Sequence, residues 1–232
     1  MNSFSNIILF LFCCIIFSCK PTKEVKITNT PTTNKTEQNT TSSKGTDTAR
    51  ETKYMTTREK DMIKEINLIR SNPKGYIPIV KSYIEDQKKM RSQLTSGQQY
   101  IDDEIKTANE LIKELQKTPK RSILLPNEGV HKAAKLHGQE GKRKGLLNHQ
   151  GKNSSWPWDR ILKHAGLNNG GENLVGGLEN VRESVMILLV DSGIKGRGHR
   201  VALLSPDWKY VACYEVGQVG DMPYYWVQNF GN

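Results

Sequence analysis

The residues whose types could do chemistry gather in four short segments in the second half of the chain. The segments are AAKLHGQE with His137, LLNHQGK with His149, GGENLVGG with Glu172 and Asn173, and GRGHR with His199 and Arg200. Two histidines and a carboxylate can form a catalytic zinc site with an open coordination position. They can equally form an acid/base pair that the carboxylate orients. His149, Glu172 and His199 are therefore the candidate catalytic residues, and their wide spacing leaves both alternatives open.

The segment DSGIKGRGHR, from Asp191 to Arg200, places one of these histidines in an unusual backbone. Its glycines make it a poor helix and a poor strand, and they favour conformations that other residues resist. We therefore expect a constrained loop that carries His199. The neighbouring Arg200 has two interpretations, because it can bind an anion or form an ion pair with Asp191 or Asp207.

Each candidate also has a purely structural interpretation. Glu172 can accept hydrogen bonds from backbone amides of its glycine-rich loop, and His149 can be a buried, satisfied histidine. His137 shares a helix face with Val130, Ala133 and Ala134, so core packing is favoured over ligation. His131 lies off that face and His164 lies in a polar stretch, so neither is a candidate.

The motif WPWD, with Trp156 and Trp158, also has two interpretations. It can be a platform on which a carbohydrate stacks, or aromatic packing over the rim of a binding cleft. The sequence has no G-x-S-x-G and no H-E-x-x-H motif. Cys213 lies in the apolar segment YVACYEV and is interpreted as a small buried hydrophobic residue, not as a catalytic thiol.

The first residues resemble an export signal. Ile7 to Phe17 are almost wholly apolar, and the segment IFSC then ends at Cys19, as in a bacterial lipobox. This predicts a lipoprotein signal peptide at residues 1–19 and acyl chains, such as palmitate, on Cys19. The alternatives are an ordinary signal peptide and an uncleaved anchor. Three of the four cysteines lie in this segment, so the exported part cannot form an internal disulfide.

Residues 20–55 are rich in Thr, Lys, Asn and Ser and have few large apolar side chains. Such a composition cannot offset the entropy of ordering the chain, so we predict a disordered tether. The folded domain is expected over residues 56–232. The formal net charge is +10, which favours contact with anionic lipid or envelope polymer over nucleic acid in an exported protein.

The folded part begins with helical patterns. Thr56 and Glu59 make a capping box for a helix that ends before Pro73, a second helical pattern follows, and a third runs from about Ser96 to Lys117. A further helix follows Asn127, and the apolar helix VRESVMILLV is expected to end at Gly193. YVACYEV and YYWVQNF flank the turn segment GQVGDMP and predict a hairpin. Helices around a small sheet are the expected architecture.

The order NHQ, GENL, DSG…GHR and SPDWKYVACYEV…YYWVQNF resembles the CAP superfamily of cysteine-rich secretory, antigen 5 and pathogenesis-related proteins, also called the SCP domain. The resemblance covers roughly Arg58 to the C-terminus, is strongest from Leu124 onward, and points to the bacterial branch. It implies an α/β fold of the α-β-α sandwich type, with a small antiparallel sheet between helical layers. Extra N-terminal helices and a helical insertion at about residues 85–117 are added to it.

The resemblance also implies a central cleft. Eukaryotic members line this cleft with two histidines and two glutamates and can bind a divalent cation there. His149, Glu172 and His199 match three of these positions, whereas Ser192, beside Asp191, takes the place of the second glutamate. A zinc or other divalent cation would thus have His149 and His199 as ligands, with Glu172 less favoured. His137, Asn173, Asp191, Ser192, Arg200 and Trp156 are the further candidate cleft residues.

These observations favour an envelope-anchored, extracytoplasmic binding module of a bacterium over an enzyme. Its cleft would hold a divalent cation or a small ligand, with lipid, sterol and envelope polymer as the implied classes. The first alternative is a hydrolase of peptide or envelope polymer that uses His149, Glu172 and His199, with or without a metal. The second is a cationic adhesion protein with a structural role, because the Lys and Arg residues are spread along the chain.

Overall fold

The computed structural model describes residues 45–232, which form a mixed sheet covered by helices. Within this range the sheet has four strands in the order β1-β3-β4-β2. These are β1 (Leu125–Pro126), β2 (Gly170–Val175), β3 (Tyr210–Val219) and β4 (Met222–Gly231). β1 pairs with β3 in parallel, and the other pairs are antiparallel. The predicted hairpin is confirmed as β3 and β4, and both strands extend further into the turn segment than expected.

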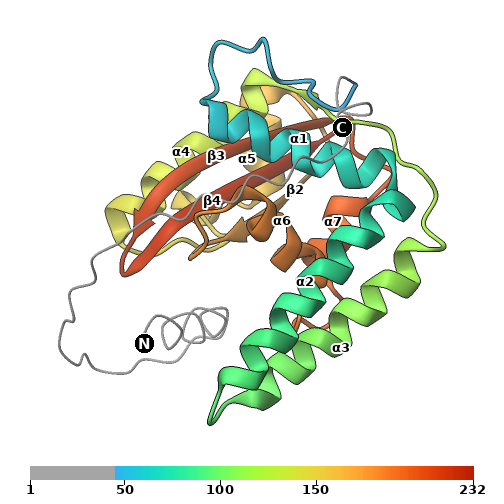
Figure 1. The fold of residues 1–232 in the computed structure, drawn as a ribbon. Coiled ribbons are helices and arrows are strands. Elements are labelled where there is room, and N and C mark those ends of the chain that lie inside the picture. The colour runs from blue at the N-terminus through green and yellow to red at the C-terminus, as the bar shows by residue number, and fades with distance from the viewer. Residues whose placement is uncertain (1–44) are drawn as a thin grey trace. The chain divides into compact units, whose positions relative to one another are not determined.

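Helices cover both faces of the sheet. Helices α4 (Glu128–Lys144) and α5 (Pro157–Ala165) lie on one face, and α1 (Thr57–Ser71), α6 (Val181–Val190) and α7 (Gly198–Leu204) lie on the other. Figure 1 shows β3 and β4 between α1 in front and α4 behind. The predicted α-β-α sandwich with a small sheet between helical layers is therefore confirmed.

Two further helices cover most of the range of the predicted insertion, residues 85–117, and the first of them begins before it. Helix α2 (Pro73–Gln93) and helix α3 (Gln98–Leu115) pack along each other, as Figure 1 shows. The chain reverses at Gly97, whose φ of 74° suits a glycine. Arg91 pairs with Asp102 near this reversal, and the Tyr83 hydroxyl donates to Glu104 over 2.6 Å deeper in the interface.

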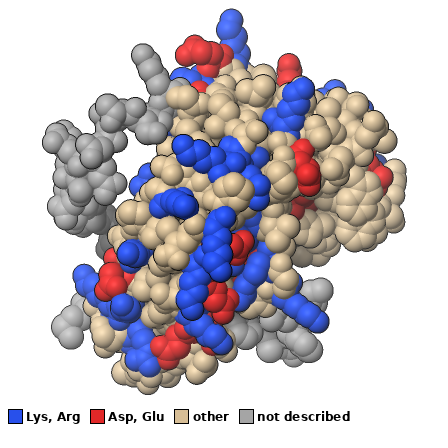
Figure 2. Space-filling model, turned by 90° about the vertical axis from the view of Figure 1, so that its right-hand side faces the viewer, with Lys and Arg blue, Asp and Glu red and all other residues tan. Residues whose placement is uncertain are grey.

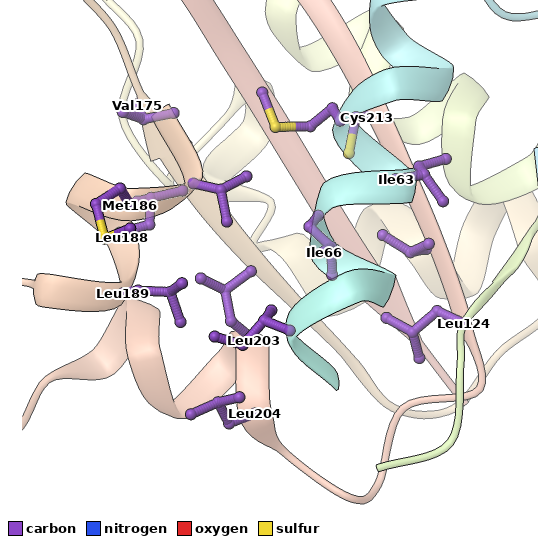
Figure 3. Close-up of a cluster of buried hydrophobic side chains, with 14 of the residues drawn as sticks. Ile63, Ile66, Leu124, Val175, Met186, Leu188, Leu189, Leu203, Leu204 and Cys213 are labelled. Atoms are coloured by element: carbon purple, nitrogen blue, oxygen red, sulfur yellow. The ribbon is translucent and has the colours of Figure 1, made fainter. Parts of the chain in front are cut away.

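The main core lies between the sheet and the helices α1, α6 and α7. Figure 3 shows Ile66 of α1 on the side of the leucines of α6 and α7, and Ile63 on the other side of the helix, toward Leu124. Cys213 lies in this core with its side chain fully buried, which confirms its interpretation as a small hydrophobic residue. Burial raises the pKa of its thiol well above the usual value, so the reactive thiolate is disfavoured.

The folded unit begins earlier than the predicted boundary at residue 56. Ala49 and Met55 are buried in the core, and the Asn67 amide donates to the carbonyl of Thr46 and to the hydroxyl of Thr48. Residues 45–55 therefore belong to the domain and not to the tether. The composition misled the prediction because side chains from α1 satisfy the polar groups of this segment.

The predicted signal peptide, Cys19 and residues 20–44 of the predicted tether lie outside the described residues. Within residues 45–232, no helix is long and apolar enough to cross a membrane.

Candidate functional site

Glu172 is the centre of the candidate site. It lies on β2, one of the two edge strands of the described sheet, and its carboxylate is completely covered by other side chains. Its Oε2 accepts from Arg160 Nη2 over 2.8 Å, and its Oε1 lies 3.1 Å from His149 Nδ1 and 3.7 Å from His137 Nε2. The structure thus gathers His137, His149 and Glu172 at one point.

Arg160, a residue of α5, was missed by sequence reasoning. Its guanidinium is almost fully buried, and besides Glu172 it donates from Nη1 to the carbonyls of His149 and Ser155. The arginine therefore neutralises the buried carboxylate and also fixes the backbone that carries His149. Removal of either partner would leave an unpaired buried charge, which costs about 3–5 kcal/mol.

Asn229 contributes a second donor from β4, where it is the register partner of Glu172. With its amide oriented so that the nitrogen faces the carboxylate, it donates to Glu172 Oε2 over 3.1 Å and accepts from the Ala134 amide over 3.2 Å. This orientation satisfies both ends of the side chain, so we assign it. It also shows that Glu172 points toward the layer of α4 and α5.

His137 is buried on the inner face of α4, as its helical position predicts. Its Nε2 faces the Asn148 carbonyl at 2.8 Å and therefore carries the ring proton. Its Nδ1 is buried and has no hydrogen-bond partner among the described residues. Burial lowers the pKa of this imidazole against the opposing effect of the Glu172 charge, so the neutral form is favoured.

His149 is different, because 44% of its side chain is exposed. The carboxylate of Glu172 accepts from its Nδ1, so Nε2 is the ring nitrogen that is free for a ligand. A buried, satisfied histidine was the alternative at this position, and the exposure of the ring does not fit it.

His199 forms a second carboxylate–imidazole pair. Its Nδ1 lies 2.7 Å from Asp191 Oδ1, and its backbone amide donates to Asp191 Oδ2 over 2.9 Å. Asp191 adopts a left-handed conformation with φ of 54° and ends α6, a role that the sequence assigned to Gly193. The bonds to His199 offset the strain of this backbone.

The loop expected over residues 191–200 is shorter in the structure. It ends at Arg197, and His199 lies in the first turn of α7. Positive φ angles at Asp191, Gly193, Gly196 and Arg197 confirm that the backbone here is unusual.

Arg200 does not form either predicted ion pair. Its buried guanidinium donates to the carbonyls of Leu189 and Val190 at the end of α6 and pairs with Glu114 of α3 over 2.9 Å. Arg200 thus satisfies carbonyls that the helix end leaves unpaired. All of its described contacts serve to hold α6, α7 and α3 together.

Helix α3 brings a third missed residue, Glu104, next to Ser192. Glu104 is buried, accepts from the Tyr83 hydroxyl over 2.6 Å, and hydrogen-bonds with Ser192. Burial raises the pKa of its carboxyl, and the charge of Asp191 acts in the same direction. A carboxyl group of α3 therefore stands beside Ser192. The signal in the sequence was its spacing from the buried residues Ile101, Ala108 and Leu111 of α3.

The two carboxylate–imidazole pairs are connected through β2. Neighbouring residues of a strand point to opposite faces, so Asn173 points away from Glu172 and toward α7. There its amide donates to the His199 carbonyl and to Gln228, each over 3.3 Å. One peptide of β2 therefore links the pair on the α5 side to the pair on the α7 side.

Trp156, the remaining residue predicted from sequence, does not join the other candidate residues. Trp156 begins α5 and is exposed, and it stacks on Trp158 and not on a candidate residue. His131, which was set aside, is buried between Tyr54 and Tyr214, with its Nε2 3.3 Å from Glu59 Oε2. That pair joins α4 to α1.

Within residues 45–232, no group of three or more His, Cys, Asp or Glu side chains is arranged to hold a metal ion. The described surface carries at least two hollows. One of about 520 Å³ is lined by Arg58 and residues of the 179–183 segment, and one of about 250 Å³ by residues of the 72–74 and 117–120 segments. Neither hollow reaches the two imidazoles.

Comparison with known proteins gave distant likenesses. No protein-family model matches the chain, and no curated protein matches it. The fold is similar to an outer surface protein of Borrelia burgdorferi, with 22% identity, a TM-score of 0.42, and coverage of 56% of this chain and 92% of that chain. It is also similar to an extracellular SCP-domain protein of Bacillus anthracis, with 19% identity, a TM-score of 0.37, and coverage of 54% and 38%. Both likenesses are too distant to establish a family.

We predict that His137 makes the folded state sensitive to mild acid. Its pKa is lowered below 6.5 on folding, so below pH 6.5 the unfolded chain binds a proton that the folded chain rejects. The free energy of unfolding should therefore fall as the pH is lowered from 6.5 toward the folded pKa. In His137→Gln, which keeps a donor for the Asn148 carbonyl, this dependence should be weaker. Chemical denaturation at a series of pH values measures it, and equal slopes for both proteins would contradict the assignment.

Proposed function

We propose that the protein is an extracytoplasmic binding module of the CAP type, and that its ligand contacts His149 and His199. One observation carries this proposal. Each of the two imidazoles has its Nδ1 held by a buried carboxylate, which leaves Nε2 as the free nitrogen. Polar groups whose orientation is fixed before binding give specificity at low entropic cost.

The surroundings of the two imidazoles favour binding over catalysis. The thiol of Cys213 is buried in the core, and the sequence lacks the common nucleophile and zinc-protease motifs. Glu172 is fully engaged by Arg160, Asn229 and the histidines, so it acts as a positioning group. A binding role requires only that the two imidazoles be oriented and accessible.

The ligand chemistry follows from the free Nε2 atoms. A neutral imidazole can ligate a divalent cation, and it can also exchange hydrogen bonds with a polar head group of a lipid-like molecule. A cation would need ligands of its own in addition to the two histidines, because the described residues offer no preformed group of three.

A hydrolase is the second candidate, and the carboxylate–imidazole pairs favour it. An imidazole oriented by a carboxylate is the usual arrangement of a general base that activates water. In this scheme Glu172 and Asp191 hold the two rings, and His149, the more exposed one, acts on water bound next to the substrate. The substrate would be a peptide or a polymer of the cell envelope.

Location and charge complete the proposal. A lipid anchor on Cys19 would hold the domain at the envelope, and the net charge of +10 suits anionic lipid or polymer. Figure 2 shows more Lys and Arg than Asp and Glu side chains on the face that it presents. If this charge were the whole function, binding would be lost at high salt and would not respond to changes at the imidazoles.

The binding proposal predicts that ligand retention depends on both imidazoles. The chain from Lys20 to Asn232 would be titrated with zinc chloride by calorimetry and extracted with organic solvent for lipid analysis by mass spectrometry. His149→Ala and His199→Ala should each lower the affinity for zinc by about tenfold or more, or lower the amount of retained lipid by a similar factor. His164→Ala, at a histidine near the end of α5, should have no effect.

Three outcomes separate the alternatives. If the intact chain binds neither zinc nor lipid, the binding proposal is contradicted. Hydrolysis of envelope polymer that disappears in both histidine variants would establish the hydrolase instead. Binding to anionic vesicles that survives both substitutions and disappears in high salt would establish adhesion by charge alone.

The anchor has its own prediction. Cys19→Ala removes the thiol that would carry the acyl chains, so the protein should move from the membrane fraction to the soluble fraction after cell lysis. Immunoblotting of the two fractions measures this. A variant that stays in the membrane fraction would contradict the lipid anchor and leave the binding proposal untouched.

A further inference from the structure

Two tryptophans on the surface are not used by the core. Trp156 and Trp158 have 41% and 50% of their surface exposed, whereas Trp226 is fully buried and Trp208 packs on Phe230. The exposed rings stack on each other, with centroids 5.5 Å apart and planes within 8° of parallel. Large exposed aromatic surface is costly in water and marks contact sites.

The pair is held rigidly. Trp156 is the N-cap of α5, and Asp159 accepts from its backbone amide over 2.8 Å. The buried Pro157 follows at the first helical position, and Arg160 holds the Ser155 carbonyl over 2.8 Å. Both rings therefore project from a backbone that the Glu172–Arg160 pair fixes, and little ordering is needed when a ligand binds.

Polar residues immediately precede the stacked pair in the sequence. Lys152, Asn153 and Ser154 are exposed in a tight loop that the bond from the Gly151 amide to the Ser155 carbonyl closes over 2.8 Å. Asn153 and Ser154 both have φ of 58°, a left-handed conformation that costs energy in residues with side chains. Such strain is concentrated at functional sites.

We propose that Trp156 and Trp158 form a saccharide-binding platform, with Asn153 and Ser154 at its polar rim. A pyranose ring whose substituents are equatorial has a flat face of C–H groups and a rim of hydroxyl or acetamido groups. The flat face matches an exposed indole, and the rim matches amide and hydroxyl side chains. The ligand class is a β-1,4-linked chain of glucose or N-acetylglucosamine units, one of whose rings packs on an outer face of the stacked pair.

A membrane surface is the other occupant to weigh, and the patch does not suit it. Helix α5 has 9 residues, and its apolar residues Pro157 and Ile161 are buried in the domain. Beyond the tryptophans it exposes one large aliphatic side chain, Leu162, and it exposes the carboxylate of Asp159 beside Trp158. Binding to the interface of anionic lipid needs a wider apolar face flanked by cations.

The platform lies next to the candidate site and is separate from it. The segment from His149 to Trp156 is continuous, and Arg160 Nη1 donates to the carbonyls of both His149 and Ser155. A saccharide chain on the platform could thus extend toward His149. The platform itself uses neither imidazole, so this proposal goes beyond the proposed function and stands or falls without it.

The test measures the binding of defined tetrasaccharides to the chain from Lys20 to Asn232. Calorimetry with the β-1,4-linked tetramers of N-acetylglucosamine and of glucose should show saturable binding of at least one. Tryptophan emission should shift to shorter wavelength as the exposed rings are covered. Trp156→Ala and Trp158→Ala should each weaken the affinity by about tenfold or more.

Matched variants separate stacking from general apolar contact. Trp158→Phe keeps a flat ring and should retain part of the affinity, whereas Trp158→Leu keeps an apolar side chain without a ring and should not. Leu162→Ala, on the same helix, should leave the affinity within about twofold, since its side chain does not belong to the stacked pair. All variants should keep the wild-type unfolding midpoint, because both tryptophans lie outside the core.

Two results would overturn the proposal. The first is the absence of saturable binding of either tetramer by the intact chain. The second is cosedimentation of this anchor-free chain with vesicles of phosphatidylcholine and phosphatidylglycerol that is lost in the tryptophan variants, which would assign the patch to a lipid surface.

Discussion

The structure of the candidate site depends on one buried ion pair, between Glu172 of β2 and Arg160 of α5. Both charges are removed from water, and further hydrogen bonds help their attraction to offset that cost. Asn229 and two histidines add to the contacts of the carboxylate, and the His149 and Ser155 carbonyls add to those of the arginine, whose Nε has no partner among the described residues. The pair therefore joins the edge strand, α5 and the loop that carries His149. This ion pair therefore fixes the backbone that carries the exposed imidazole of His149 and the backbone next to the stacked tryptophans.

The opposite face of β2 repeats the same arrangement with different elements. Asp191 ends α6 and holds His199, while Asn173 holds the carbonyl of His199 from the strand. The insertion takes part in this side. Helix α3 places Glu104 beside Ser192, pairs Glu110 with Arg197, and pairs Glu114 with Arg200. Helix α3 thus holds the segment around His199 through these three carboxyl groups. A carboxylate and an imidazole on each side of one strand give two oriented ring nitrogens from a small number of elements.

The regular parts of the fold were predictable from sequence because their apolar spacing matches their packing. The capping box at Thr56, the helix of α6 and the hairpin of β3 and β4 belong to this group. Three features were not predictable in this way. Helix α5 is short, and tryptophan and proline stand at its N-terminus, so the sequence lacks a clear apolar spacing for a helix there. The helix is anchored by one arginine, Arg160, whose partners lie on other elements. Residues 45–55 look polar and are ordered by contacts with α1, and Glu104 reaches its partners only through tertiary packing. Among the site residues, His149, Glu172, Asp191 and His199 were named from sequence, whereas Arg160, Asn229 and Glu104 were not.

A double-mutant cycle between Glu172 and Arg160 tests this account most directly. Glu172→Gln and Arg160→Met each leave the other charge buried without its partner, and each should lower the free energy of unfolding by about 3–5 kcal/mol. The double variant has no unpaired charge, so its loss should be smaller than the sum of the single losses by well over 1 kcal/mol, roughly the upper part of the range found for contacting residues. Equilibrium denaturation of the four proteins gives this coupling energy. Losses that add to within about 0.5 kcal/mol would show that the two side chains act independently. In that case the buried ion pair would not be what organises the site.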